Sequence, residues 1–382
     1  MTGAVDAWAI IAGGGTAGHV TPGLSIAREI RRRGVPAEGV LWVGSERGIE
    51  ARLVPEAGFP LKLLPGRGIQ RRLALANVGA IIGLVRAMVQ ALVLVRRQRP
   101  AVVVGLGGYA SVPCVLAAFV WRVPVVVAEQ NAVPGAANRL AARFAKACAL
   151  SFPDTELRRG TWTGNPVRPE ILAVDRSRDR AEARQQLGVP DGRRLLAVFG
   201  GSLGARRINN ALLDAAGEWR ADDTLSIRLV GGSRDHADLA ARNPVTDGDD
   251  LHFELVEYED DMPVVYAATD LVVCRSGASS VAELAAIGVP AVLVPLPGAP
   301  GDHQTANARA LVEAGAAVMV VDGELDGARL RSEVEALIGD PDRLAAMSTA
   351  ASAVARRDAA AAVVDLVAAH ARRPLPLVEE AS

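Results

Sequence analysis

The chain has 382 residues, half of them hydrophobic, with 38 Gly, 22 Pro and a formal net charge of -1. This length suits two domains with separate cores, and the near-neutral charge excludes a global argument for a nucleic-acid partner. Three cysteines lie in apolar surroundings without metal-site spacing, so we expect reduced core residues and no metal site: Cys114, Cys148 and Cys274.

The first predicted element is a buried strand from Trp8 to Ala12, and no basic residues precede it as they would in a signal peptide. The following Gly13–Gly15 loop opens a helix and is similar to a dinucleotide fingerprint, in which the helix start faces a phosphate. Glu46 stands further along than the usual ribose-binding acid, which argues against NAD. His19, in the first turn, is either a capped surface residue or a general base.

After strands at residues 40–43 and 61–64 comes a long apolar stretch, Leu73 to Val95. Its central Arg86 costs roughly 2.5–3.5 kcal/mol on insertion scales, so we expect a crossover helix rather than a membrane span. Its excess apolar surface could rest on an anionic membrane. The alternative is a wholly buried helix with basic ends. The candidate membrane residues are Arg71, Arg72, Ile81, Ile82, Leu84 and Val85.

Residues 57–128 contain no Asp or Glu but nine basic residues, so one face of this half is predicted to be basic. Strands are expected at 101–105, 123–128 and 147–151. Glycine-rich residues around Tyr109 follow the first of these. Asn131 follows the second, and Asn138 lies on the next helix. Amides at strand ends are either turn formers or partners for ligand hydroxyls.

Beyond a linker at 163–168 the pattern begins again, with strands at 195–199, 226–230, 252–256, 271–274, 289–294 and 317–321. This repetition predicts an α/β protein with two doubly wound Rossmann-like domains facing each other across a cleft. We expect an N-terminal domain at 1–166, completed by a helix around 355–372, and a C-terminal domain at 167–354. The tail at 373–382 is expected to be disordered.

The stretch from Arg275 to Asn307 combines two strand ends with polar loops and two helix starts. Small residues after the first strand allow a close approach to an anion at a helix N-terminus. Glu283, one turn into that helix, suits ribose hydroxyls. The ends of neighbouring parallel strands share one edge of a sheet, so Gln304 and Asn307 are expected beside this loop.

Six motifs occur together in the order seen in glycosyltransferase family 28, and the chain resembles these GT-B enzymes from about Trp8 to Ala355. The motifs are Gly14–His19, Gly107–Tyr109, Glu129–Asn131, Gly164–Arg168, Gly200–Ala205 and Arg275–Glu283. The resemblance implies an inverting transfer of GlcNAc from UDP-GlcNAc to the 4-hydroxyl of MurNAc-pentapeptide on undecaprenyl diphosphate. It also implies a peripheral enzyme on the cytoplasmic face of the cell membrane.

The resemblance also assigns site residues. His19 is the candidate base, and the acceptor side of the cleft comprises Thr16, Ala17, Gly18, Tyr109, Asn131 and Asn138. The donor side comprises Arg168, Ser202, Glu259, Arg275, Ser276, Gly277, Ala278, Ser279, Ser280, Glu283 and Gln304. Ala17 replaces a frequent Gly, and Glu259 replaces an aliphatic residue near the uracil.

No cofactor is expected to be required, because helix N-termini and Arg168 can stabilise the departing diphosphate, although stimulation by a divalent cation stays open. Three alternatives also stay open. The chain could act on another lipid or small-molecule acceptor, it could be a UDP-GlcNAc epimerase, or it could be a non-catalytic UDP-sugar sensor at a membrane surface.

Overall fold

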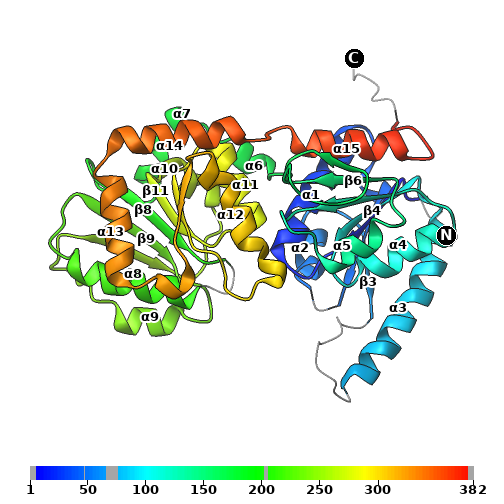
Figure 1. Cartoon of the computed structure of the whole chain (residues 1–382), viewed down its shortest axis with the longest axis horizontal. Helices are drawn as coiled ribbons and strands as arrows, with labels where there is room; N and C mark the ends of the chain where they lie inside the picture. Colours follow the sequence, from blue (N-terminus) through cyan, green and yellow to red (C-terminus); the bar gives the residue numbers. More distant parts are fainter. Residues whose placement is uncertain (1–5, 47, 66–75, 202–204, 377–382) are drawn as a thin grey trace. The chain divides into compact units, whose positions relative to one another are not determined.

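The computed structural model describes residues 6–46, 48–65, 76–201 and 205–376, with residues 76–82 described by their backbone only. The chain forms two compact units (Figure 1). Unit 1 comprises residues 1–168 and 356–382, and unit 2 comprises residues 169–355. The last helix therefore returns to the first unit.

Unit 1 is a parallel sheet with the strand order β3-β2-β1-β4-β5-β6-β7. Its strands are β1 Ala9–Gly13, β2 Val40–Ser45, β3 Leu61–Leu64, β4 Val102–Gly107, β5 Val125–Glu129, β6 Ala147–Leu150 and β7 Gly160–Trp162. Its helices are α1 Ala17–Arg32, α2 Glu50–Glu56, α3 Ala76–Gln98, α4 Ser111–Val120, α5 Ala136–Ala141 and α15 Ala359–His370.

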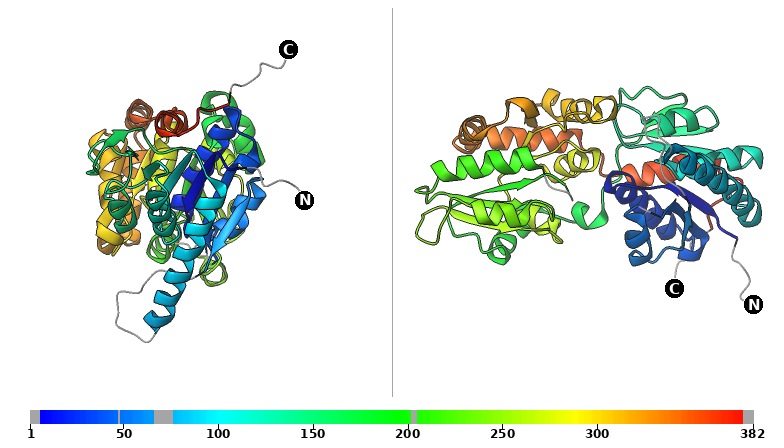
Figure 2. Two further views of the ribbon diagram at one scale, coloured as in Figure 1. Left: turned by 90° about the vertical axis from the view of Figure 1, so that its right-hand side faces the viewer. Right: turned by 90° about the horizontal axis from the view of Figure 1, so that it is seen from below.

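Both faces of this sheet are covered, because alternate residues of the buried strands point to opposite sides. Ile11 packs in a cluster with residues of α1 and α15, whereas Ile10 packs with residues of α3 and α4. Figure 2 shows helices on both sides of the sheet. The exposed edge strand β7 was not predicted.

Unit 2 repeats this topology with the strand order β10-β9-β8-β11-β12-β13, so the predicted duplication of architecture is confirmed. Its strands are β8 Arg194–Phe199, β9 Leu225–Val230, β10 His252–Val256, β11 Leu271–Cys274, β12 Ala291–Leu293 and β13 Ala317–Met319. Its helices are α6 Pro169–Leu172, α7 Arg176–Gln186, α8 Arg206–Glu218, α9 His236–Arg242, α10 Met262–Ala268, α11 Ala278–Ile287, α12 His303–Glu313, α13 Gly327–Ile338 and α14 Pro341–Val354.

The end of the chain is better packed than expected. Trp8 Nε1 donates a hydrogen bond to the Pro374 carbonyl at 3.0 Å, and Leu375 packs against the core of unit 1. The predicted disorder is therefore wrong for residues 373–376, and residues 377–382 lie outside the described part of the chain. The polar and proline-rich composition concealed these contacts with the first strand.

Candidate active site

Two predicted site residues of unit 1, His19 and Asn138, lie close together at the carboxyl end of β4. Thr16 caps α1, and its Oγ1 lies 3.2 Å from His19 Nδ1. A Cβ atom added to Gly107 would lie 3.2 Å from His19 Nε2 and 3.3 Å from the Asn138 amide atoms. His19 and Asn138 therefore meet over Gly107, where a side chain would displace them.

Asn138 is held by Glu129, which belongs to the Glu129–Asn131 motif but was not predicted to be a site residue. Glu129 ends β5 and is 2% exposed. Its Oε2 accepts hydrogen bonds from Asn138 Nδ2 at 2.9 Å and from the Gly135 N–H at 3.0 Å, while its Oε1 accepts from the Asn131 N–H at 2.9 Å. Glu129 thus fixes both predicted amide residues. An acid at the carboxyl end of a buried parallel strand was the available signal.

Asn138 also carries a buried atom without a hydrogen bond. Asn138 is 1% exposed, and its Oδ1 has no hydrogen-bond partner among the described residues. Such a buried acceptor is costly unless a partner arrives, for example a ligand hydroxyl. The amide beside His19 can therefore take one more hydrogen bond.

The other predicted acceptor residues lie around this point. Ala17 and Gly18 form the first turn of α1, whose N–H groups are not all used within the helix. Tyr109 donates its hydroxyl to the Pro65 carbonyl at 3.1 Å, and burial raises the pKa of this phenol. Tyr109 therefore connects the loops after β3 and β4.

In unit 2 the loops after β11 and β12 lie together, as the sequence predicts. Ser276 is fully buried, and its Oγ donates to the Gln304 carbonyl at 2.8 Å. Asn307 Nδ2 donates to the Ser276 carbonyl at 3.2 Å. Gln304 in turn accepts a hydrogen bond from the Leu296 N–H at its Oε1 at 2.9 Å. The loops after β11 and β12 therefore form one surface.

Helix α11 begins on this surface, with Gly277 as its N-cap and Ala278, Ser279 and Ser280 in its first turn. Glu283 lies one turn further on and is 7% exposed. Its Oε2 accepts a hydrogen bond from the Tyr266 hydroxyl at 3.0 Å. Tyr266, on α10, was not predicted, because its contact with Glu283 depends on the packing of two helices.

The guanidinium of Arg275 contacts two carbonyl groups and one carboxylate of the protein. Its Nη1 donates to the carbonyls of Val294 and Pro295 at 3.2 and 3.1 Å, and to Asp322 Oδ1 at 2.6 Å. Arg207 pairs with the other oxygen of Asp322 at 3.2 Å. Arg275 therefore fixes the ends of β11 and β12, while its predicted contact with a donor stays a prediction.

Three predicted donor residues remain, namely Glu259, Arg168 and Ser202. The Glu259 carboxylate accepts from Arg228 Nε at 2.8 Å and from the Asp261 N–H at 3.0 Å. Arg168 ends the first segment of unit 1. Ser202 lies outside the described residues. A role of Glu259 in binding the base would thus fall to its backbone, and the donor contacts of Arg168 and Ser202 stay predictions.

Helix α3 exposes an apolar stripe on the surface of unit 1. Val85, Val89 and Val93 are 58%, 56% and 45% exposed and follow one another at helical spacing. Leu84 is half-buried. Among the other predicted membrane residues, Arg71 and Arg72 and the side chains of Ile81 and Ile82 lie outside the described part of the chain.

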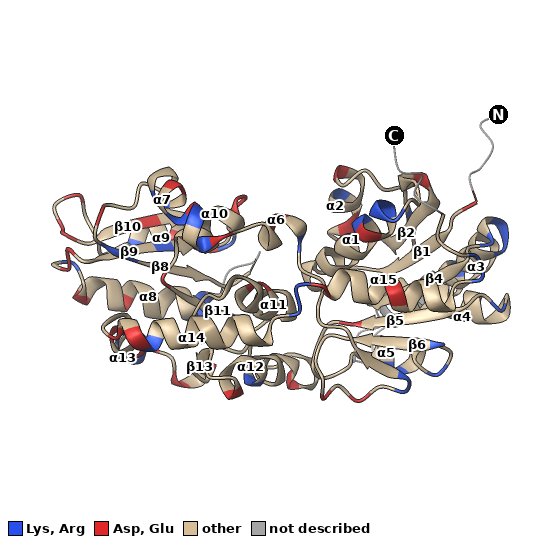
Figure 3. Ribbon diagram, turned by 90° about the horizontal axis from the view of Figure 1, so that it is seen from above, with Lys and Arg blue, Asp and Glu red and all other residues tan. Residues whose placement is uncertain are grey.

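This stripe is accompanied by exposed arginines, namely Arg86, Arg96, Arg97 and Arg99. The Arg96 guanidinium lies 4.9 Å from the Trp121 ring centre. Figure 3 shows basic residues near the end of α3. Within the described ranges, none of the helices has both the length and the apolar content needed to cross a membrane.

Comparison with known proteins matches nearly all of this chain to one family. The family model of the glycosyltransferase family 28 N-terminal domain matches residues 9–150, and that of the C-terminal domain matches residues 195–363.

Two relatives carry the name UDP-N-acetylglucosamine–N-acetylmuramyl-(pentapeptide) pyrophosphoryl-undecaprenol N-acetylglucosamine transferase. The protein from Nocardioides sp. is 44% identical over 351 residues, which are 92% of this chain and 94% of the relative. The protein from Acidothermus cellulolyticus is 43% identical over 367 residues, which are 95% of this chain and 98% of the relative. The crystal structure of Acinetobacter baumannii MurG is 30% identical with a TM-score of 0.75, covering 94% of this chain and 98% of that chain.

Proposed function

Because the chain belongs to glycosyltransferase family 28, it is a UDP-GlcNAc-dependent glycosyltransferase, and we propose that unit 1 activates the acceptor while unit 2 holds the donor. The enzyme transfers GlcNAc to MurNAc-(pentapeptide) pyrophosphoryl-undecaprenol, converting lipid I to lipid II in peptidoglycan synthesis. The main support for these separate roles is the proximity of His19 and Asn138 beside Gly107.

In this proposal the acceptor is the 4-hydroxyl of MurNAc, and His19 removes its proton as the oxygen attacks the anomeric carbon. The contact between His19 Nδ1 and Thr16 supports this role, because it leaves Nε2 on the side of Gly107 and Asn138. Asn138 Oδ1 accepts a hydrogen bond from the sugar, and Glu129 keeps the amide in place. Direct attack inverts the configuration of the anomeric carbon.

On the donor side, the N-terminus of α11 receives the diphosphate of UDP-GlcNAc, since backbone N–H groups at a helix start stabilise negative charge. Glu283 accepts hydrogen bonds from the ribose, and Gln304 contacts the sugar. The hydrogen bonds between Ser276 and residues 304 and 307 support this arrangement, because they hold both loops at one edge of the sheet.

The decisive experiment is transfer of labelled GlcNAc from UDP-GlcNAc to lipid-linked MurNAc-pentapeptide. We expect labelled lipid and free UDP in equal amounts. Conversion of UDP-GlcNAc alone into an isomer would support an epimerase instead. Binding of UDP-GlcNAc without product in the presence of acceptor would support a sensor. Either outcome would contradict the proposal.

We further propose that the α3 stripe docks this enzyme peripherally on the anionic cytoplasmic face of the cell membrane. The exposed Val85, Val89 and Val93 provide apolar area, and the neighbouring arginines provide attraction to anionic lipid of about 1 kcal/mol each. A lipid-linked acceptor also requires the enzyme to reach a membrane surface.

Vesicle sedimentation tests this docking. The double change Val85→Glu and Val89→Glu should abolish most binding to phosphatidylglycerol vesicles, and 0.5 M salt should weaken wild-type binding. Val321→Glu is a matched control, since Val321 is 55% exposed in unit 2. Unchanged sedimentation of the double variant would refute this surface as the docking site.

A further inference from the structure

A buried acid that the proposed chemistry does not use lies beneath the glycine-rich loop of unit 1. Glu50 is the first residue of α2 and is 0% exposed. Its Oε2 accepts a hydrogen bond from the Gly15 N–H at 2.8 Å. Its Oε1 accepts from the Ser45 N–H at 2.8 Å and from the Ser45 hydroxyl at 3.1 Å. Both oxygens are therefore bound by groups at the ends of β1 and β2.

The space around this carboxylate is shaped by glycines. A Cβ atom added to Gly14, Gly44 or Gly48 would lie 2.3, 2.4 or 1.9 Å from the nearest Glu50 side-chain atom. A side chain at any of these positions would displace Glu50 from its place, so backbone from three places encloses the acid. Burial of a carboxylate is expensive unless hydrogen bonds satisfy it, as they do here. The local sequence is thus built around Glu50.

The loop that Glu50 contacts resembles the part of a dinucleotide-binding fold whose N–H groups receive a phosphate. In unit 1 the Gly15 N–H instead binds the chain's own carboxylate. We propose that Glu50 is a positioning residue, an internal anion that replaces a ligand phosphate in this loop and fixes Thr16 and His19 for attack by the acceptor. This inference rests on the proposed role of His19.

The connection from Glu50 to His19 is short. Gly15, which donates to Glu50, directly precedes Thr16. Thr16 then contacts His19 twice, since its carbonyl accepts the His19 N–H at 3.1 Å and its Oγ1 lies 3.2 Å from Nδ1. Loss of the anion would release the loop at Gly15, and His19 would lose its orientation. Displacements of about 1 Å can lower turnover by about 100-fold.

The same contacts also predict what Glu50 does not affect. Its described hydrogen bonds all lie in unit 1, whereas Glu283, Ser276 and Gln304 lie in unit 2. Removal of the carboxylate should therefore lower kcat and leave the KM for UDP-GlcNAc unchanged. A residue that only supported overall stability would lower the apparent kcat in proportion to the unfolded fraction, also at unchanged KM, so kcat is expressed per folded enzyme and would then equal that of wild type.

The test compares full-length Glu50→Ala, Glu50→Gln and Glu56→Ala with wild type in the transfer assay. Glu56 lies on the same helix with its side chain 55% exposed and serves as the matched control. We expect Glu50→Ala to lower kcat by about 10- to 100-fold at unchanged donor KM. Added formate should restore much of this loss, because it can enter the vacated space and accept the same hydrogen bonds.

Glu50→Gln keeps the shape but has only one acceptor oxygen, so it loses one of the two backbone hydrogen bonds. We expect a smaller loss of kcat and no rescue by formate, since its site stays filled. This variant also tests the inference if Glu50→Ala fails to fold. Three outcomes would overturn the inference. Both variants could keep the wild-type kcat, the donor KM could rise as kcat falls, or formate could leave kcat of a folded Glu50→Ala enzyme unchanged. A wild-type enzyme without transfer would instead refute the proposed function.

Discussion

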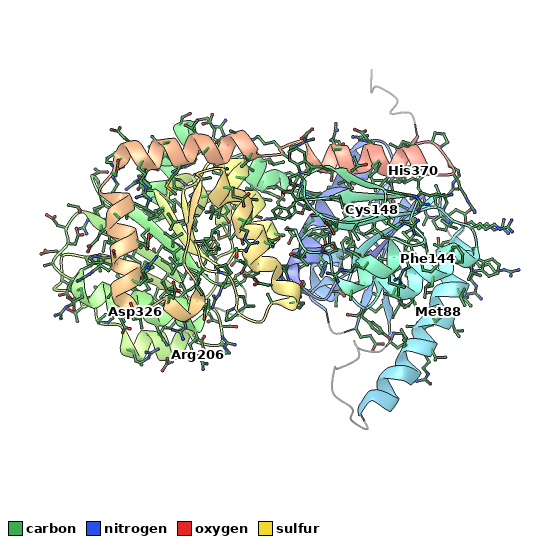
Figure 4. The ribbon with its side chains drawn as sticks, viewed as in Figure 1. Met88, Phe144, Cys148, Arg206, Asp326 and His370 are labelled. Atoms are coloured by element: carbon green, nitrogen blue, oxygen red, sulfur yellow. The ribbon has the colours of Figure 1, made fainter. Side chains whose placement is uncertain are left out.

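The two units share one topology but satisfy their buried acids in different ways. In unit 1, Glu50 and Glu129 accept hydrogen bonds mainly from backbone N–H groups and amides at strand ends. In unit 2, the acid that follows the second strand, Asp235, binds the side chains of Arg206 and Arg234 instead. Figure 4 labels Arg206 at the start of α8.

This difference agrees with the proposal that the two units bind different substrates. Acids bound to backbone in unit 1 make a fixed polar surface around His19, which suits a neutral hydroxyl. In unit 2, Asp235 and Asp322 pair with arginines, and in our proposal the N-terminus of α11 receives the anionic donor. Exposed arginines of unit 1 lie on α3 and just beyond its end, where we propose that they face a membrane. The following four changes test this separation.

The largest expected effect is that of His19→Ala, which removes the proposed base of unit 1. We expect kcat to fall by about 10²- to 10⁴-fold with little change in the KM for UDP-GlcNAc. His370→Ala, in the last turn of α15, is the control and should behave as wild type. Turnover near wild type would show that His19 is not the base, and it would contradict the proposed role of unit 1.

Asp270→Asn should destabilise unit 2 by about 3 kcal/mol, because it weakens a buried cluster of charges. Asp270 is bound by Arg180, Arg184 and the Leu195 N–H. Thermal unfolding of wild type and variant at pH 7 measures the difference. Equal melting temperatures would show that the ion pairs of Asp270 do not stabilise unit 2.

The stability difference between wild type and Asp270→Asn should also depend on pH. Burial opposes ionisation of Asp270, but the Leu195 N–H and the arginines outweigh it and lower its pKa. A carboxyl whose pKa is lowered by folding stabilises the protein above its unfolded pKa of about 3.9. The advantage of wild type should therefore be constant at neutral pH and disappear as the pH falls through the folded pKa.

Glu283→Ala should raise the KM for UDP-GlcNAc by about 10- to 100-fold, since hydrogen bonds to a charged group contribute about 1.5–3 kcal/mol. Initial rates at saturating acceptor measure this effect. Glu313→Ala, at the exposed end of α12, is the control. An unchanged KM would mean that the ribose lies elsewhere.

The smallest effect is expected for Tyr266→Phe, which removes the hydroxyl that binds Glu283. This hydroxyl orients Glu283 and does not itself bind the donor, so we expect the donor KM to rise by only about 5-fold, equivalent to about 1 kcal/mol, while kcat stays near wild type. Tyr258→Phe is the control, because Tyr258 is 56% exposed. A fall in kcat alone would contradict a role confined to donor binding.

Much of the fold was predictable because parallel strands buried on both faces appear as short apolar runs between glycine-rich turns. Leu271 to Cys274 is a strand with the predicted bounds. The strand from Gly160 to Trp162 was missed, since all three residues are exposed and no alternation marks them. Its strand character depends on pairing with β6.

The candidate site was predictable only for residues on recognisable loops. His19, Asn138 and Ser276 lie on loops or helices that follow strand ends. The contact between Ser276 and Gln304 was expected, whereas the proximity of His19 and Asn138 was not. Glu50 was missed because its partner Gly15 is 35 residues away, and Glu46 drew attention as the acid after the second strand. The contacts of Arg275 with Asp322 were hidden for the same reason.

The return of α15 to unit 1 has a consequence for synthesis on the ribosome. Residues 169–355 are contiguous, so this half can fold as soon as it emerges. The earlier half must wait, because Val363, Val364 and Val367 of its last helix are synthesised almost 200 residues later and are at most 1% exposed in its core. In nascent chains truncated before residue 356, unit 2 should therefore resist protease, whereas the sheet of unit 1 should be incompletely covered and more sensitive to it.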